Sequence, residues 1–194
     1  MLPARRAAAI AFVLVLTPLL AGCNASLWLK QQSVVNIWVA PQPASKSALN
    51  DFQTLKLGVL SIAIRQGQDL QPQNFAFNGD PKVLDMVQGG NPQPVKVVST
   101  TMSLRAISAI TVRVEGEDAV RARGDSLQWC YPGKPGVKEP CVSIPQNGGY
   151  VIDNHPVVLA RGNTVDVYFP LSVQFDGTEY FIQTDSALLR QSTE

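Results

Sequence analysis

Few residues in this sequence could carry acid–base or nucleophilic chemistry. His155 is the only histidine in the 194 residues, so a Ser-His-Asp arrangement must use it, with Asp153 close by. The sequence has no Gly-x-Ser-x-Gly nucleophile elbow, and His155 precedes Pro156 shortly after the turn-forming Asn147–Gly149. These features favour an exposed loop histidine over a catalytic one.

Carboxylates are the other candidate groups. Asp-x-Asp-x-Asp-Gly spacing, typical of a calcium loop, does not occur among the aspartates Asp80, Asp85, Asp118, Asp125, Asp153, Asp166 and Asp176. Neither double glycine is followed by Lys-Ser or Lys-Thr, so no phosphate-binding loop is predicted. We therefore expect no metal and no cofactor. A glycosidase-type pair of carboxylates assembled in space stays open, and with it a hydrolase.

Charge and composition limit the partners. Sixteen basic and 15 acidic residues leave a formal net charge of +1, which provides no basic surplus for neutralising phosphates. Hydrophobic residues make up 45% and charged residues 16% of the chain, a balance typical of a folded protein rather than a disordered one. The sequence therefore argues against nucleic-acid binding.

The N-terminus has the features of an export signal. Arg5 and Arg6 precede an apolar run, Ala7–Leu20, that is shorter than the roughly 20 residues of a membrane-spanning helix. Leu20-Ala21-Gly22-Cys23 follows, and the whole resembles the signal peptide and lipobox of bacterial lipoproteins. The resemblance implies export and lipid (palmitate) on Cys23, with attachment to a membrane of the envelope, the outer membrane being favoured. An ordinary secretory signal with a free Cys23 and a retained helix remain alternatives.

With Cys23 assigned to lipid, Cys130 and Cys141 remain, on the oxidising side of the membrane. We expect them to form a disulfide that closes a protruding loop rich in Pro and Gly, which in the chain-entropy model stabilises by roughly 3 kcal/mol. A free thiol pair or a redox site is the alternative, although the spacing is not Cys-x-x-Cys.

The closed loop carries the best candidate binding surface. Trp129 and Tyr131 on a rigid loop could stack on a sugar or anchor a partner protein, and Lys134 and Lys138 lie in the same loop. The alternative is that Trp129 packs over the disulfide inside the domain.

Several segments predict strands. Val34–Val39 begins the first strand, and Leu55–Arg65 shifts its apolar phase, which predicts a bulge near Gly58–Leu60 or a strand buried on both faces. Six apolar residues alternate from Val165 to Phe175, Asp176-Gly177 supply a type I′ turn, and Thr178–Gln183 closes a hairpin. Pro170 places this strand at an edge or marks a bulge.

Other segments are assigned from local signals. Asp80-Pro81 predicts a short helix ending at Gln88, and Val95–Val98 predicts a short edge strand. Ile110–Val114 and Asp118–Arg123 predict a hairpin. We interpret Gly67–Asn78 as a loop whose phenylalanines fold back onto the core.

These elements predict a mainly β fold, a single antiparallel β-sandwich of immunoglobulin- or transthyretin-like type with at most one or two short helices. The second half resembles an uncharacterised family of prokaryotic lipoprotein β-sandwich domains, through Val83–Val87, Ile107–Val114, Lys134–Lys138 and Pro156–Gly162. The resemblance implies fold and envelope location, and it supplies no catalytic residues.

The predicted organisation follows from these assignments. Residues 1–22 form the signal peptide, 23–33 a short lipid-anchored linker, 34–185 the sandwich and 186–194 a C-terminal tail. The favoured function is a non-catalytic, lipid-anchored protein that binds another envelope component, protein or glycan. The alternatives are a small-ligand or polysaccharide-binding module using Trp129 and Tyr131, and a carboxylate-based hydrolase.

Overall fold

A computed structural model describes residues 32–42, 48–77, 82–116, 121–122, 124, 126 and 128–193. The predicted signal peptide, the lipobox with Cys23 and almost all of the predicted linker lie outside the described residues. Within the described ranges, no helix is long and apolar enough to cross a membrane.

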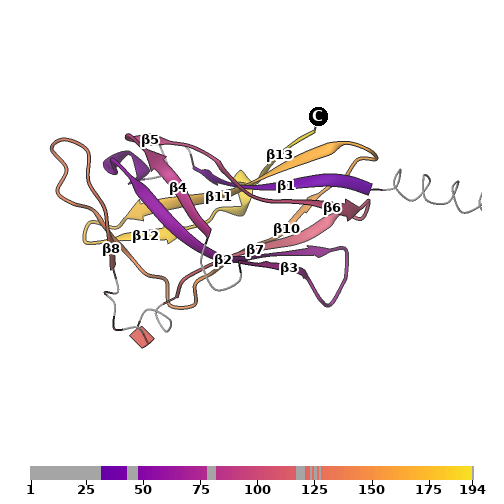
Figure 1. The fold of residues 1–194 in the computed structure, drawn as a ribbon, viewed down its shortest axis with the longest axis horizontal. Helices are drawn as coiled ribbons and strands as arrows, with labels where there is room; N and C mark the ends of the chain where they lie inside the picture. Colours follow the sequence, from indigo (N-terminus) through magenta and orange to yellow (C-terminus); the bar gives the residue numbers. More distant parts are fainter. Residues whose placement is uncertain are drawn as a thin grey trace, which may run out of the picture.

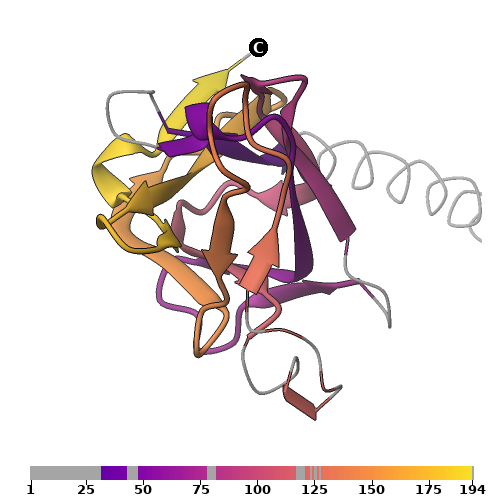
Figure 2. The same ribbon diagram turned by 90° about the vertical axis from the view of Figure 1, so that its left-hand side faces the viewer.

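The described chain is mainly β and forms two curled sheets (Figures 1 and 2). One sheet has the order β6 (Val95–Ser103), β1 (Gln32–Pro41), β11 (Thr164–Phe175), β12 (Tyr180–Gln183), β9 (Cys141–Ser143) and β8 (Gln128–Cys130), with β13 (Arg190–Thr193) also paired to β11. The other has the order β10 (Gly149–Val157), β7 (Ile107–Val114), β2 (Leu55–Gln66), β4 (Lys82–Gln88) and β5 (Asn91–Pro92), with β3 (Gln73–Ala76) beside β2. Two short 3-10 turns, η2 (Ala48–Asp51) and η3 (Ser186–Leu188), complete the named elements.

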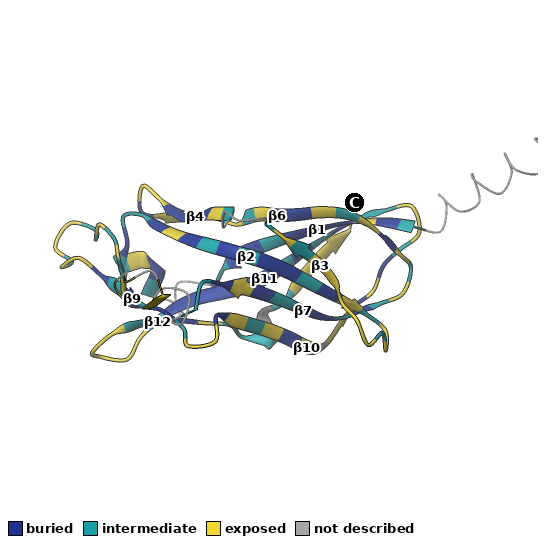
Figure 3. Cartoon of the chain, turned by 60° about the horizontal axis from the view of Figure 1, so that its bottom comes forward, coloured by how far each residue is buried: buried dark blue, intermediate teal, exposed yellow. Residues whose placement is uncertain are grey.

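One hydrophobic core lies between the two sheets. Alternate residues of the long strands point inward, as the striped burial pattern in Figure 3 shows, because successive side chains of a strand face opposite sides. The buried set draws on both sheets and includes Val35, Ile37, Val39, Leu57, Ile62, Leu84, Met86, Val112, Val165, Val167 and Phe169. The predicted mainly β fold is confirmed.

The sheet that contains β1 and β11 is mixed, whereas the sheet that contains β2 and β7 is purely antiparallel. β1 pairs with β11 in parallel, from Val34 opposite Thr164 to Pro41 opposite Leu171, and β12 pairs with β9 in parallel. Parallel neighbours need a long connection between them, whereas local alternation and turn residues indicate only hairpins between adjacent strands. The prediction of an all-antiparallel arrangement is wrong at these two pairs.

β11 is an interior strand, and Pro170 lies where its partner changes. On one side β11 pairs with β1, and on the other it pairs first with β13, up to Tyr168, and then with β12, from Ser172 onward. Pro170 lies between these two partners, where its missing amide hydrogen leaves no ladder bond unmade. The sequence predicts an edge strand or a bulge at Pro170. The structure has neither: the register against β1 is continuous through Ala40 opposite Pro170, and the other side of β11 has a local gap in pairing. The predicted hairpin is confirmed, but β12 begins at Tyr180 rather than Thr178. The loop is the four residues 176–179, where Asp176 donates its amide to the Glu179 carbonyl at 3.3 Å, in place of the predicted two-residue type I′ turn.

The helix predicted up to Gln88 is wrong. Lys82–Gln88 form β4, which pairs with β2 and β5, while Asp80 and Pro81 lie outside the described residues. Leu84 and Met86 are buried at a spacing of two, and this alternation outweighs the helix-start signal.

The first predicted hairpin is also wrong. β7 is flanked by β2 and β10, so both of its edges are occupied. Residues 117–120 and 123 lie outside the described residues, and Arg121–Ala122 are in a helical turn.

The remaining local predictions hold in part. The bulge in β2 is confirmed, since its register against β7 shifts between Val59 and Ser61. β6 is an edge strand but is longer than predicted, and the predicted loop Gly67–Asn78 contains β3. Beyond residue 185, η3 and β13 extend the strand pairing to Thr193.

Candidate functional site

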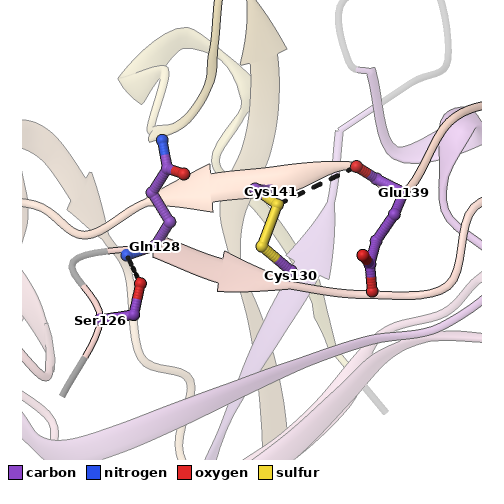
Figure 4. Close-up of a disulfide and its surroundings, with 5 residues drawn as sticks. All are labelled: Ser126, Gln128, Cys130, Glu139 and Cys141. Atoms are coloured by element: carbon purple, nitrogen blue, oxygen red, sulfur yellow. Dashed lines mark hydrogen bonds between the residues drawn. A yellow bond between two sulfur atoms is a disulfide. The ribbon is translucent and has the colours of Figure 1, made fainter.

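The predicted disulfide between Cys130 and Cys141 is present (Figure 4). The two cysteines lie directly opposite each other at the last pair of the β8–β9 ladder, with a Cα–Cα distance of 4.0 Å. The bond therefore closes a hairpin whose loop is Tyr131–Pro140.

The first part of this loop is docked onto the chain around η2. Gln53 donates its backbone amide to the Pro132 carbonyl at 2.8 Å, and Lys134 donates to the Asp51 carbonyl at 2.9 Å. Phe52 and Gly133 form an isolated β-bridge between these contacts. A Cβ on Gly133 would lie 2.8 Å from the Val137 carbonyl oxygen, so the close fold of the loop requires glycine. In the rest of the loop, Pro135, Gly136, Lys138 and Glu139 are exposed and Val137 is half-buried.

Both loop aromatics pack inward. Trp129 and Tyr131 are half-buried against the hydrophobic core. The Tyr131 hydroxyl donates to the backbone carbonyl of Lys56, and its ring meets Phe52 edge-on at a centroid distance of 6.3 Å. Burial raises the pKa of Tyr131 to about 12. The two rings thus do not form an exposed, coplanar stacking platform.

More aromatic rings continue this packing. Tyr180 contacts Phe52 at a centroid distance of 5.3 Å and Phe175 at 4.7 Å, and its hydroxyl donates to Asp51 Oδ2 at 3.0 Å. Burial, helped by the hydrogen bond and charge of Asp51, raises the pKa of Tyr180. Phe175, at the outer end of this series, is 48% exposed. We call the β8–β9 hairpin with its loop, η2 and these rings the stapled end.

The two lysines of the predicted surface lie on the outside of the stapled end. Lys138 is exposed at the loop tip, and Lys134 is half-buried. The stem of Lys134 lies against Gly90, where an added Cβ would be 2.7 Å from Lys134 Cε. The four residues predicted as one surface therefore divide into two rings that face the core and two lysines that face outward.

A second aromatic group, which the sequence analysis did not single out, lies on the outer face of the other end of the same sheet. Strand register places Lys96 opposite Trp38, Trp38 opposite Tyr168 and Tyr168 opposite Arg190. Directly paired residues point to the same face, so the four side chains form one row across β6, β1, β11 and β13. We call it the cation–aromatic row.

Contacts within the row fix its aromatic side chains. Lys96 Nζ lies 5.2 Å from the centre of the Trp38 ring, and Tyr168 stacks with Trp38 at 5.9 Å with 20° between the planes. Asp166 Oδ1 accepts hydrogen bonds from Trp38 Nε1 at 3.1 Å and from Asn36 Nδ2 at 2.7 Å. The alternation of Val35, Ile37 and Val39 could have placed Trp38 outward, but only the parallel β1–β11 register brings it to Tyr168.

The other candidate groups remain dispersed. His155 is exposed on β10 and, among the described residues, is hydrogen-bonded to no serine or carboxylate. Groups of three or more His, Cys, Asp or Glu side chains that could hold a metal ion do not occur in the described part of the chain.

Comparison with known proteins adds no relative. Neither a family model, nor a curated protein, nor a solved structure matches this chain.

Proposed function

We propose that the protein is an exported, lipid-anchored binding module, without catalytic activity of its own, that presents its stapled end to a partner protein of the bacterial envelope. Lipid attachment at Cys23 rests on the resemblance of Leu20-Ala21-Gly22-Cys23 to a lipobox. The two curled sheets around one core support a β-sandwich scaffold. The two parallel pairs depart from an all-antiparallel immunoglobulin- or transthyretin-like topology.

The observation that carries the proposal is the rigidity of the stapled end. Its loop is closed by a disulfide and docked by two backbone hydrogen bonds onto residues 51–53. A loop held in one conformation loses little entropy on binding, so more of the interaction energy appears as affinity. Partly exposed Phe175 offers an apolar anchor, and Lys138 offers a charged rim contact.

The position of the stapled end suits this role. β1 begins at Gln32, and residues 24–31 separate it from Cys23. The start of β1 lies at one end of the elongated molecule, and the β8–β9 loop lies at the other (Figure 1). A protein anchored through Cys23 would hold the stapled end away from the membrane surface.

Affinity purification after crosslinking in intact cells tests the proposal. We expect a reproducible protein partner with the native chain, and loss of that partner with the unanchored Cys23→Ala variant. The double variant Lys138→Glu/Phe175→Ser should lose the partner while remaining anchored and folded.

The matched control is Arg65→Glu/Val158→Ser, which makes the same kinds of change at exposed residues outside the stapled end. This control should retain the partner. Equal recovery of the partner by both double variants would refute binding through the stapled end.

A further inference from the structure

A groove borders the cation–aromatic row on the outer face of the sheet. It encloses about 420 Å³, with Ala40, Pro41 and Pro94 among its lining residues, together with Tyr168, Arg190 and Ser192. Ala40 lies two residues after Trp38 on β1, and Pro94 lies two residues before Lys96, just ahead of β6. Their short side chains leave a hollow beside the large side chains of the row. The groove is therefore a consequence of strand register and side-chain size.

The electrostatic character of the groove is positive. Arg190 lines it, Lys96 lies in the adjoining row, and neither has a carboxylate partner among the described residues. The residues that line the groove in the described structure include no carboxylate. Asp166 lies two positions before Tyr168 on the same face of β11, opposite Ser192, and its Oδ1 accepts hydrogen bonds from Asn36 and Trp38. Among the described residues, the two cations Arg190 and Lys96 thus outnumber the one carboxylate, Asp166, on this part of the face, and Arg190 is the charged side chain that lines the groove.

The aromatic wall of the groove is held in position before any ligand arrives. Tyr168 stacks on Trp38, and Trp38 is fixed in turn by Lys96 above its ring and by its hydrogen bond to Asp166. An aromatic ring with proline and alanine beside it suits the apolar face of a sugar ring, while a few polar groups fix the orientation. The guanidinium of Arg190 can bind a carboxylate or phosphate through two parallel hydrogen bonds.

We propose that this groove binds an anionic saccharide, whose ring packs against Tyr168 and the proline-lined floor and whose acidic group pairs with Arg190. Gln191 and Ser192 from β13 supply polar groups for sugar hydroxyls. This site is separate from the stapled end and depends neither on the protein partner nor on the lipid anchor.

Isothermal titration of the full chain in detergent tests the proposal with three probes. Trigalacturonate carries carboxylates, glucose 6-phosphate carries a phosphate, and maltotriose is neutral. We expect at least one anionic probe to bind tenfold or more tightly than maltotriose. Which anionic probe binds more tightly identifies the acidic group. The proposal is overturned if maltotriose binds as tightly as the anionic probes, or if none of the three probes binds at millimolar concentration.

Variants locate the binding. Arg190→Gln changes an exposed side chain and should lower the affinity for the anionic probe at least tenfold without changing the unfolding midpoint. Tyr168→Ala should also lower the affinity for the anionic probe, whereas Tyr168→Phe should retain most of that affinity. Arg65, on β2, is also exposed, so Arg65→Gln is the control and should bind as the native chain does. Unchanged affinity in Arg190→Gln overturns the assignment of the site.

Discussion

The stapled end and the cation–aromatic row each include a pair of aromatic side chains near lysines, Trp129 with Tyr131 and Trp38 with Tyr168, yet they use them in opposite ways. At the stapled end, Tyr131 faces the core and its hydroxyl is bonded to the Lys56 carbonyl. In the row, Trp38 and Tyr168 lie on the outer face of the sheet between Lys96 and Arg190. The first pair stabilises the fold, and the second pair borders a groove.

The difference teaches that loop position alone does not expose an aromatic ring. Trp129 and Tyr131 flank Cys130 in the sequence, and the β8–β9 pairing turns them toward the core. Trp38 lies in a run of apolar residues that predicts burial, and the alternation of its strand turns it outward. Strand register therefore decides whether a ring faces the core or the outer face of the sheet, and substitutions in the two regions should have different effects.

The largest contrast is expected for truncation of a ring. Phe52 has no exposed surface and contacts Tyr131 and Tyr180, so Phe52→Ala should cost about 3–5 kcal/mol of unfolding free energy. Trp38→Ala should cost roughly 1 kcal/mol, because it removes stacking and cation–π contacts on an outer face. Urea denaturation of both variants measures the two changes in unfolding free energy. Equal losses of unfolding free energy would contradict the distinction between the two regions.

Removal of the disulfide should have the next largest effect. The double variant Cys130→Ser/Cys141→Ser should lose about 3 kcal/mol, because the unfolded chain is no longer constrained. Thermal unfolding should show the same loss for the native chain after reduction. The groove beside the cation–aromatic row should keep its saccharide affinity in this variant. A loss of affinity there would show that the two regions are coupled.

Deletion of one hydroxyl sharpens the comparison further. Tyr131→Phe leaves the Lys56 carbonyl without its donor and should cost about 1 kcal/mol. Tyr168→Phe is the matched control, since its hydroxyl has no hydrogen-bond partner among the described residues, and its stability should not change measurably. Chemical denaturation with both variants decides whether the hydroxyls differ in this way.

The smallest effect is expected in alkaline titration. Burial raises the pKa of Tyr131 to about 12, above the value near 10 of an unfolded tyrosine. The neutral phenol therefore stabilises the fold fully below about pH 10, and this contribution is lost as the pH rises through about 12. Burial also raises the pKa values of Tyr150 and Tyr180, so ultraviolet titration should show a late phenolate signal that Tyr131→Phe reduces without removing. If the signal lost in Tyr131→Phe lies near pH 10 instead, the burial of the ring is contradicted.

Patterns of local alternation predicted much of the fold. The alternation of Val165, Val167 and Phe169 predicted β11, and the phase shift near Gly58–Leu60 predicted the irregularity in β2. The helix expected before Gln88 failed because Asp80-Pro81 resembles a helix start, whereas Leu84 and Met86 are buried as alternating strand residues.

Non-local pairing could not be predicted. The parallel register of β1 and β11 joins Trp38 to Tyr168 across a long connection, and no local signal in either strand specifies its partner. The disulfide was predictable because two cysteines remained after Cys23 was assigned. The inward orientation of Tyr131 was not, because it depends on contacts with Phe52 and Lys56 far away in the sequence.

Photo-crosslinking in intact cells tests the central claim, that the stapled end meets a protein partner, most directly. A photoreactive amino acid is placed at Lys138, on the loop tip, or at Thr101, an exposed residue of β6 on the face of the cation–aromatic row. We predict a discrete protein adduct from position 138, its loss in the Cys23→Ala background, and no such adduct from position 101. An adduct from position 101 alone, or none from position 138, would contradict the account.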